Sequence, residues 1–372
     1  MAKPTFSQYA VVVFYVVVWY IGNILYLKYN KDAAKAFAVQ PMICPKGKKC
    51  PPTAMVPNGH PDTSAWGMSV ATGQLLVGVL YAIYLWIAPD TRPMPKITLA
   101  DVKKMAPTGI CSALAHACSV FALSVGGVVF GTIVKAAEPV FSAIISAVVY
   151  KHPPSIYKFL CFIPIVGGIA IAVLEFPNFV ISNPATWTPR IDSNFFSFWS
   201  LIYACAANVF AAFKGLEGKK VKDDKELKAK LGNEANSFAV FGVISLLVSI
   251  PLMIFKEGGN PGGFGSLYKI VAQPDGKALT SLLLSGITFY LYNECAFMTL
   301  KSDTNPAGMD AVTNSVANTA KRVAAIYFGA LFDNLPLTKE KIVGSAVCIA
   351  GVFLYSVIDD LVAKFGKKDK KA

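Results

Sequence analysis

Three cations lie inside apolar stretches that are long enough to be membrane helices. Lys135 lies in VVFGTIVKAAEPVFSAIISAVVY, and Lys321 and Arg322 lie in AVTNSVANTAKRVAAIYFGAL. A cation in the middle of such a helix costs about 2.5–3.5 kcal/mol on insertion scales, so it usually faces a polar cavity that serves an ion or a substrate. Two Lys and one Arg suit a phosphate dianion, because Lys supplies a point charge and the Arg fork donates two parallel hydrogen bonds to phosphate oxygens. The sequence therefore predicts an anion site, and phosphate is the anion that matches it best.

Three polar side chains are expected at a similar depth. His116 and Ser119 lie one turn apart in GICSALAHACSVFALSVGG, and Tyr292 lies in LLLSGITFYLYNECAF. At 1.5 Å per residue, His116 lies roughly 17 Å and Tyr292 roughly 21 Å along its expected helix. We expect these groups to bind the carboxylate, carbonyl or hydroxyl groups of an organic ligand. Each also has a structural interpretation: a core histidine bonded to a carbonyl, a serine bonded back to its own helix, and a packed tyrosine.

Two acidic residues can neutralise part of the positive charge. Glu138 follows Lys135 by three residues, on the same helix face, and can pair with it. Glu294 can do the same for Lys321 or Arg322. Two acids against three cations leave a net positive centre, which favours an anion site. A purely structural network of ion pairs is the alternative interpretation.

The composition indicates which elements must position these residues. The chain has 372 residues, 54% of them hydrophobic and only 15% charged, whereas soluble proteins have about 25% charged residues. Its apolar stretches are about twenty residues long, enough to cross roughly 30 Å of hydrocarbon, and they lack the alternation of barrel strands. We therefore predict an all-α integral membrane protein with ten transmembrane helices. The expected helices are 7–29, 64–89, 105–125, 127–150, 155–176, 194–216, 236–256, 278–300, 308–332 and 339–361.

The connecting segments are expected to be irregular for the most part. The connection 30–63 is long, with a short amphipathic helix possible in DAAKAFAV, and Thr98 is placed to cap the helix that begins with DVKKM. The Lys-rich segment 217–235 is predicted to be a solvated central linker. The segment 257–276 contains GGNPGGFG and is predicted to be an irregular loop. The terminal charge run KFGKKDKKA is expected to be disordered.

The two halves of the chain, 1–192 and 193–372, repeat one pattern. Lys135 is followed by an apolar run, then KHPPS, then CFIPIVGGIAIAV; Lys321 is followed by an apolar run, then DNLPLT, then GSAVCIAGVFLYS. With five helices in each half, the second copy must be inverted relative to the first. Inverted repeats with a site at their interface are a recurring architecture of secondary transporters. The similarity is loose, and chance is the alternative explanation.

The charge and the cysteines exclude several kinds of partner. The formal net charge is +13, but the basic residues lie mostly in predicted loops and tails, where they set topology and attract anionic lipid. They form no basic face interleaved with aromatics, so we expect no nucleic-acid partner. Most of the eight cysteines lie in apolar stretches, where they behave as small hydrophobes. Cys44 and Cys50 flank a loop and are either bonded or free, and no regular ligand spacing predicts a metal or another cofactor.

The sequence carries no signature of an enzyme. It contains no phosphate-cradling glycine loop, no HExxH and no GxSxG, so we expect a protein without enzymatic activity. A channel is disfavoured because it requires rings of charge along a pore rather than one central cluster. The start MAKPTFSQYA is too short to be a transit peptide, so we expect none in this chain.

Several segments together resemble the plastidic phosphate translocators of the drug/metabolite transporter superfamily. They are WYIGNILYLKYNK, RPMPKITLADVKKMAP, FGTIVKAAEPVFSAIIS, IPIVGGIAIAV, YLYNECAF and NSVANTAKRV, in the family's order over nearly the whole chain. The resemblance implies ten helices in two inverted halves and a location in the inner envelope of a plastid. It also implies strict exchange of inorganic phosphate for phosphorylated C3, C5 or C6 compounds. Our hypothesis for the mechanism is alternating access, driven by the substrate gradients without ATP.

The resemblance also implies roles for individual residues. In the family, a lysine matching Lys135 and a Lys-Arg pair matching Lys321 and Arg322 hold phosphate. His116, Ser119 and Tyr292 match residues that contact the organic part. Members that prefer phosphoenolpyruvate tend to have Asn at the position of His116, which points this chain towards triose phosphate and 3-phosphoglycerate.

Two departures from the family pattern bear on the substrate. Thr132 stands where the family usually has a His, and the link KSDTNPAGMDAVTN appears longer than is usual. The alternatives are therefore an exchanger of phosphoenolpyruvate, pentose phosphate or hexose phosphate, or a nucleotide-sugar transporter of the same superfamily. The alternative outside the class of transporters is a structural or receptor-like membrane protein. The expected partners are inorganic phosphate, the organic phosphate and membrane lipid, and we expect a functional monomer.

Overall fold

The computed structural model describes residues 6–38, 63–89, 91–175, 190–192, 196–260, 263–300, 305–309 and 311–368. Cys44, Cys50 and most of the predicted connection 30–63 lie outside these residues. The helices of the first part are α1 Phe6–Ala36, α2 Gly67–Ile87, α3 Leu99–Gly126, α4 Val128–Lys135, α5 Glu138–Val148, α6 Ile156–Leu160 and α7 Phe162–Val173. Two short strands, β1 Leu174–Glu175 and β2 Arg190–Ile191, then pair antiparallel. The helices that follow are α8 Phe198–Asp223, α9 Lys225–Leu231, α10 Glu234–Glu257, α11 Gly263–Val271, α12 Lys277–Met298, α13 Ala311–Asp333 and α14 Lys339–Lys368.

Among the described residues, eight helical segments are long and apolar enough to cross a membrane: α1, α2, α3, α4 with α5, α6 with α7, α8, α10 and α14. The predicted helices 278–300 and 308–332 are present as α12 and α13, but they are not among these eight. Both carry polar groups in the middle, Tyr292, Asn293 and Glu294 in α12 and Lys321 with Arg322 in α13.

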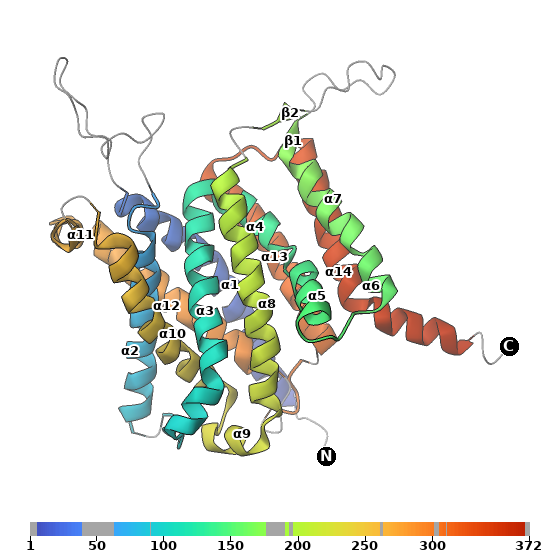
Figure 1. Ribbon diagram of the computed structural model, residues 1–372, viewed down its shortest axis with the longest axis horizontal. Coiled ribbons are helices and arrows are strands. Elements are labelled where there is room, and N and C mark those ends of the chain that lie inside the picture. The colour runs from blue at the N-terminus through green and yellow to red at the C-terminus, as the bar shows by residue number, and fades with distance from the viewer. Residues whose placement is uncertain are drawn as a thin grey trace.

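The long helices pack in pairs that are far apart in the sequence. α3 lies along α8, α1 along α12, and α7 along α14, and α7 and α14 form one edge of the bundle (Figure 1). The approach of α7 to α14 requires glycine, because a Cβ at Gly344 would lie 2.3 Å from the backbone nitrogen of Ala172, and one at Gly168 would lie 2.4 Å from that of Cys348. Small residues allow helix backbones to come this close in a membrane.

The prediction that Thr98 caps a helix is confirmed. Its side chain accepts a hydrogen bond from the backbone N–H of Asp101, while Asp101 Oδ2 accepts one from the backbone N–H of Thr98 at 2.8 Å. This capping box satisfies two N–H groups that the first turn leaves without partners. α3 therefore begins at Leu99, six residues before the expected start of the helix at 105.

Several sequence predictions about connections are wrong. The segment 217–235 is not a solvated linker, because α8 continues to Asp223 and α9 follows with Leu227 and Leu231 buried. The predicted irregular loop 257–276 contains the helix α11. The predicted continuous helix 127–150 is interrupted between α4 and α5, and the helix α14 extends to Lys368, into the run that was expected to be disordered.

Candidate functional site

A cavity of about 540 Å³ lies between α2, α3, α8, α10 and α12. His116, Ser119 and Lys135 line one end of it, and Lys219 and Lys222 line the other. Both of the latter are exposed and belong to the last turns of α8, just before α9. The cavity therefore opens on the face of the bundle where α9 lies.

Lys135 is the first-half cation that lines this cavity. It is the last residue of α4, and its Nζ donates a hydrogen bond to Ser119 Oγ at 2.8 Å. Ser119 Oγ in turn donates to the carbonyl of Ala115 in its own helix at 2.6 Å. The serine thus bonds back to its own helix, as the structural interpretation expects, and also accepts a hydrogen bond from Lys135. Its contact with a substrate stays a prediction.

Arg322 reaches across from α13 to the same place. Its Nη1 donates to the backbone carbonyl of Lys135 at 2.6 Å, and its Nη2 lies 3.0 Å from Glu138 Oε2. Glu138 therefore pairs with Arg322, which differs from the predicted pairing of Glu138 with Lys135. The carboxylate lies close enough to both cations to neutralise part of their joint charge.

Lys321 and Tyr292 contact each other through the aromatic ring. Lys321 Nζ lies 5.8 Å from the centre of the Tyr292 ring and 5.0 Å from that of Trp19. Tyr292 packs against Phe289 with ring centres 5.9 Å apart, and Phe289 packs against His116 at 4.1 Å. These contacts link the second-half cation to the histidine of the first half.

The six predicted site residues are thus connected, but only some of them face the cavity. His116, Ser119, Lys135 and Tyr292 line it, whereas Lys321 and Arg322 are not among its described lining residues. The latter two lie one layer behind, in contact with a lining residue each. His116 is buried, and within the described part of the chain its Nε2 has no hydrogen-bond partner.

The predicted partner of Glu294 is wrong. Glu294 does not pair with Lys321 or Arg322; it lies 2.6 Å from Arg92, which belongs to the connection between α2 and α3. Both side chains are largely buried. Tyr292 stands two residues before this pair in α12, so the ion pair ties the helix that carries Tyr292 to the first half of the chain.

Sequence reasoning missed a further cation of the cavity, Lys214 in α8. Lys214 lies near the end of the predicted helix 194–216, next to the Lys-rich segment 217–235. For this reason the sequence does not distinguish it from the lysines of the predicted linker. Its helix offers a signal, however: Ala207, Ala211, Gly215 and Gly218 also line the cavity, and their spacing marks one face of small residues. A lysine beside such a face points along an open space rather than into a packed core.

The opposite face of the bundle is closed by two carboxylates at helix ends. Glu257, the last residue of α10, is buried and accepts hydrogen bonds from the backbone N–H groups of Met68 at 2.6 Å and Ser69 at 2.9 Å, at the start of α2. Asp333, the last residue of α13, accepts from the N–H of Val128 at 2.7 Å and pairs with Lys31 at 2.8 Å. N–H groups of a first helical turn have no partner inside the helix, and they carry the positive end of its dipole.

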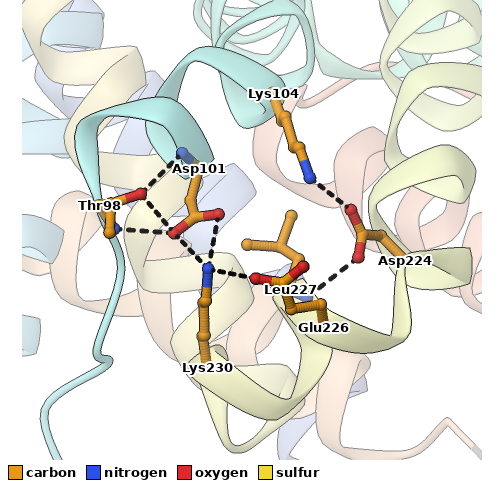
Figure 2. Close-up of polar contacts among 7 residues, drawn as sticks. All are labelled: Thr98, Asp101, Lys104, Asp224, Glu226, Leu227 and Lys230. Atoms are coloured by element: carbon orange, nitrogen blue, oxygen red, sulfur yellow. Dashed lines mark hydrogen bonds and ion pairs between the residues drawn. The ribbon is translucent and has the colours of Figure 1, made fainter.

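Ion pairs also join α3 to α9 on the face where the cavity opens (Figure 2). Lys104 Nζ lies 2.9 Å from Asp224 Oδ2, and Lys230 Nζ lies 3.2 Å from Asp101 Oδ2 and 2.7 Å from Glu226 Oε1. Hydrogen bonds from the Leu227 backbone and from Lys104 lower the pKa of Asp224. Hydrogen bonds to Glu226 and Asp101 raise the pKa of Lys230. These contacts fix α9 to α3 beside the cavity mouth.

Comparison with known proteins identifies the family of the chain. The profile of the Triose-phosphate Transporter family matches residues 63–356. The chain is similar to phosphoenolpyruvate/phosphate translocator 3, chloroplastic, of Oryza sativa subsp. japonica, with 28% identity over 92% of this chain and 72% of the relative. It is also similar to the triose phosphate/phosphate translocator, non-green plastid, chloroplastic, of Brassica oleracea var. botrytis, with 26% identity over 93% of this chain and 72% of the relative. A third similar protein, glucose-6-phosphate/phosphate translocator 2, chloroplastic, of Arabidopsis thaliana, shares 24% identity over 92% of this chain and 74% of its own length. The chain belongs to the Triose-phosphate Transporter family.

Proposed function

We propose that this protein is a secondary antiporter that exchanges inorganic phosphate for phosphorylated C3 metabolites, triose phosphate and 3-phosphoglycerate. The observation that carries the proposal is the cationic end of the cavity, where Lys135 and Lys214 line the space and Arg322 bonds to the backbone of Lys135. A phosphate dianion is the ligand that such a set of donors binds best. The names of the relatives, which are phosphate translocators for three kinds of organic phosphate, support the same class of substrate.

In the proposed site, Lys135, Lys321 and Arg322 bind the phosphate group. Lys321 lies one layer behind the cavity wall in this conformation, against the ring of Tyr292. A small rotation of α13 or of the tyrosine brings its ammonium group to a ligand that lies at Lys135. His116, Ser119 and Tyr292, which line the cavity, face the organic part of the substrate.

We propose ten membrane spans in two inverted repeats, 1–192 and 193–372. The support is the symmetry of the helix pairs when α1, α2, α3, α4–α5 and α6–α7 are matched with α8, α10, α12, α13 and α14. The pair α3 and α8 then corresponds to the pair α12 and α1. The pair α3 and α10 corresponds to the pair α12 and α2. The two helices of each of these four pairs are in contact. The pairs α2–α10, α4–α13 and α7–α14, which correspond to themselves, are in contact too.

The two faces of this bundle support the proposal of alternating access. The cavity opens towards α9, while Glu257 and Asp333 hold helix ends of the two halves together on the other face. The symmetry relates the bond from Glu257 to the start of α2 to a contact at the start of α10, where Trp86 Nε1 donates to Asn236 Oδ1 at 2.9 Å. An exchange of open and closed faces between the repeats would move the ligand across the membrane.

The excess of positive charge gives a reason for strict exchange. In the empty site Glu138 offsets one cation, and the remaining cations keep a net positive charge that is costly to enclose in a medium of low dielectric constant. Bound phosphate cancels this charge, so both faces can close and the carrier can turn over. The empty carrier returns slowly, and a second phosphate compound must therefore travel back.

The experiment is exchange in liposomes loaded with phosphate, against triose phosphate, 3-phosphoglycerate, phosphoenolpyruvate, pentose phosphate, hexose phosphates and nucleotide sugars. The proposal expects triose phosphate and 3-phosphoglycerate, the C3 compounds of this panel that carry a free hydroxyl group, to exchange fastest. Lys135→Ala, Lys321→Ala or Arg322→Ala is expected to abolish exchange while the protein keeps its melting temperature in detergent. Exchange near the wild-type rate by any of the three would remove that residue from the site. A preference for phosphoenolpyruvate, pentose phosphate or hexose phosphate would support a phosphate antiporter with a different organic substrate. A preference for nucleotide sugars would contradict the phosphate antiporter and support a nucleotide-sugar transporter.

The proposed location is the inner envelope of a plastid, and the proposed active unit is the monomer. The relatives named above are chloroplastic proteins, which supports the first proposal. For the second, the support is that helices of one chain supply all the described lining of the cavity, mainly α2, α3, α8, α10 and α12, together with Tyr26, Lys135 and Glu138.

A further inference from the structure

The interruption between α4 and α5 frees a backbone acceptor beside the cavity. α4 ends at Lys135, and Pro139 occupies the first turn of α5. In a continuous α-helix the N–H of residue 139 would donate to the carbonyl of residue 135. Proline has no N–H, so the carbonyl of Lys135 is free to accept a hydrogen bond from elsewhere. Arg322 Nη1 supplies that bond, at 2.6 Å.

The same turn presents a second acceptor to the same guanidinium. Glu138 lies between the freed carbonyl and the proline, and its Oε2 is 3.0 Å from Arg322 Nη2. The two nitrogens at the end of the arginine fork are therefore both held by residues of one short turn. A guanidinium has five N–H groups in a fixed plane, so these two bonds set its orientation and leave other N–H groups for an anion.

The neighbouring carbonyl of the interruption, that of Val134, accepts a hydrogen bond from the backbone N–H of Ala137 at 3.1 Å and a second one from a neutral side chain. Asn208 of α8 donates from Nδ2 to the carbonyl of Val134 at 3.0 Å. This bond supports the interrupted backbone without involving a charge. The interrupted backbone thus accepts one hydrogen bond from a neutral side chain, Asn208, and one from a cationic side chain, Arg322. The two bonds can be tested separately.

We propose that Pro139 and Glu138 are positioning residues for Arg322, and that they dock it beside Lys135 to complete the phosphate site. The inference rests on the function proposed above and adds to it how the site is assembled. α13 supplies the arginine, and the interrupted helix supplies both acceptors. The second-half ligand is therefore in place only while α13 lies against the turn between α4 and α5, so phosphate binding and the contact between the halves depend on each other.

The test starts from Pro139→Ala, which restores the missing N–H. The new N–H competes with Arg322 for the carbonyl of Lys135, so the KM for phosphate in liposome exchange is expected to rise about tenfold. Alanine is a better helix former than proline, so the melting temperature in detergent is expected to hold or to rise. A lower affinity together with an undiminished melting temperature is the result that a merely structural proline would not give.

The matched control is Pro251→Ala. Pro251 also removes an N–H inside a helix, α10, but that N–H would bond to the carbonyl of Leu247, which does not line the cavity, whereas Lys135 does. Its KM for phosphate is expected to equal that of the wild type. A second control, Asn208→Ala, removes the neutral support of the interruption and is expected to lower the melting temperature more than it changes the KM.

The acidic partner is tested with Glu138→Gln and Glu138→Ala. Glutamine keeps an oxygen acceptor for Arg322 and is expected to raise the KM less than alanine does. In the Arg322→Lys background, which lacks the planar fork that the two acceptors orient, Pro139→Ala is expected to cause no further rise in the KM. Equal KM values for Pro139→Ala and the wild type, or full additivity with Arg322→Lys, would overturn the inference.

The assay separates this inference from the proposed function. A wild-type protein that exchanges no phosphate would remove the proposed function. A wild-type protein that exchanges phosphate, with Pro139→Ala and Glu138→Ala variants of unchanged KM, would remove only the positioning roles. A phosphate-induced rise in the wild-type melting temperature that Pro139→Ala reduces provides a second measure, independent of transport, and an unreduced rise counts against the inference.

Discussion

Asp333 Oδ2 lies 2.7 Å from the backbone nitrogen of Val128, so the end of α13 supplies an acceptor for the start of α4. Glu257 at the end of α10 does the same for the start of α2. In each case a carboxylate of the second half meets the positive end of a helix of the first half, the favourable placement for a negative charge. Both contacts lie on the closed face, and both must break if that face is to open.

Loss of these carboxylate bonds is expected to open the closed face. In a cysteine-free background, Ser124→Cys reports access to this face, because its backbone carbonyl accepts a hydrogen bond from Thr63 there. Asp333→Asn or Glu257→Gln weakens bonds to a charged acceptor, which are worth about 1.5–3 kcal/mol, and about 1.4 kcal/mol corresponds to a tenfold change in population. The rate of labelling by an impermeant maleimide is therefore expected to rise about tenfold. Asp275→Asn, which removes an exposed ion pair with Lys277, is the control; equal rates in all variants would contradict a gate at these carboxylates.

Lys214 is expected to contribute to substrate affinity although it lies far along the chain from the other cations. Lys214→Gln removes a positive charge that lines the cavity, and the KM for organic phosphate is expected to rise about tenfold, because charge-assisted bonds are roughly twice as strong as neutral ones. Lys214→Arg keeps the charge and is expected to retain most of the affinity. Lys220→Gln on the same helix is the control, since Lys220 is exposed and pairs with Glu217. An equal KM for Lys214→Gln and Lys220→Gln would show that Lys214 makes no contact with the substrate.

His116→Asn is expected to change the choice among organic phosphates more than it changes phosphate binding. The histidine lines the cavity next to Phe289, and its Nε2 has no hydrogen-bond partner in the described residues. Asparagine is shorter and offers a different donor and acceptor pattern. The measurement is the ratio of exchange rates for triose phosphate and phosphoenolpyruvate, and an unaltered ratio would remove the histidine from substrate selection.

Gly344→Ala is expected to destabilise the protein. A Cβ there would lie 2.3 Å from the backbone of Ala172, and backbone atoms cannot rotate away, so α7 and α14 must separate at a cost of about 1–3 kcal/mol. The melting temperature in detergent should fall. Gly167→Ala is the matched control on α7, because a Cβ at Gly167 meets nothing within 4 Å. Equal melting temperatures for the two variants would contradict the close contact.

The ion pairs beside α9 are expected to make the stability of the folded protein depend on pH. The pKa of Asp224 is lowered from its ordinary value of 3.8 by hydrogen bonds from the Leu227 backbone and Lys104. The folded protein therefore binds fewer protons at this group than the unfolded chain does, and the stabilisation is present above pH 3.8 and lost as the pH falls through the lower folded value. The melting temperature of Asp224→Asn is expected to be lower than that of the wild type at pH 7, and the difference should shrink towards pH 3. A difference that is constant across this range would exclude the carboxylate as its source.

The sequence predicts the positions of most long helices, because these follow from composition along a single segment. An apolar stretch of twenty residues has few alternatives to a membrane helix, and Lys135 in such a stretch is conspicuous. The lengths are less well predicted, since polar ends such as Lys219 and Lys222 continue α8 beyond its apolar part.

The pairing of charges is not predictable from spacing alone. Glu138 lies one turn from Lys135, yet its partner is Arg322, because Pro139 interrupts the helix and turns the carboxylate towards α13. Glu294 pairs with Arg92, which is two hundred residues away in the chain. Such partners depend on how the helices pack, and that information does not lie in either segment by itself.

Because the cavity opens beside α9, we expect an inhibitor that binds in it to act from only one side of the membrane. If the protein is the antiporter proposed above, we expect a bulky polyanion to bind at Lys219 and Lys222, which line the cavity at its mouth, and to hold the protein in this conformation. Such a compound is expected to inhibit exchange when it is applied from the α9 side of a sealed vesicle. Applied from the other side, it cannot reach the cavity of this conformation.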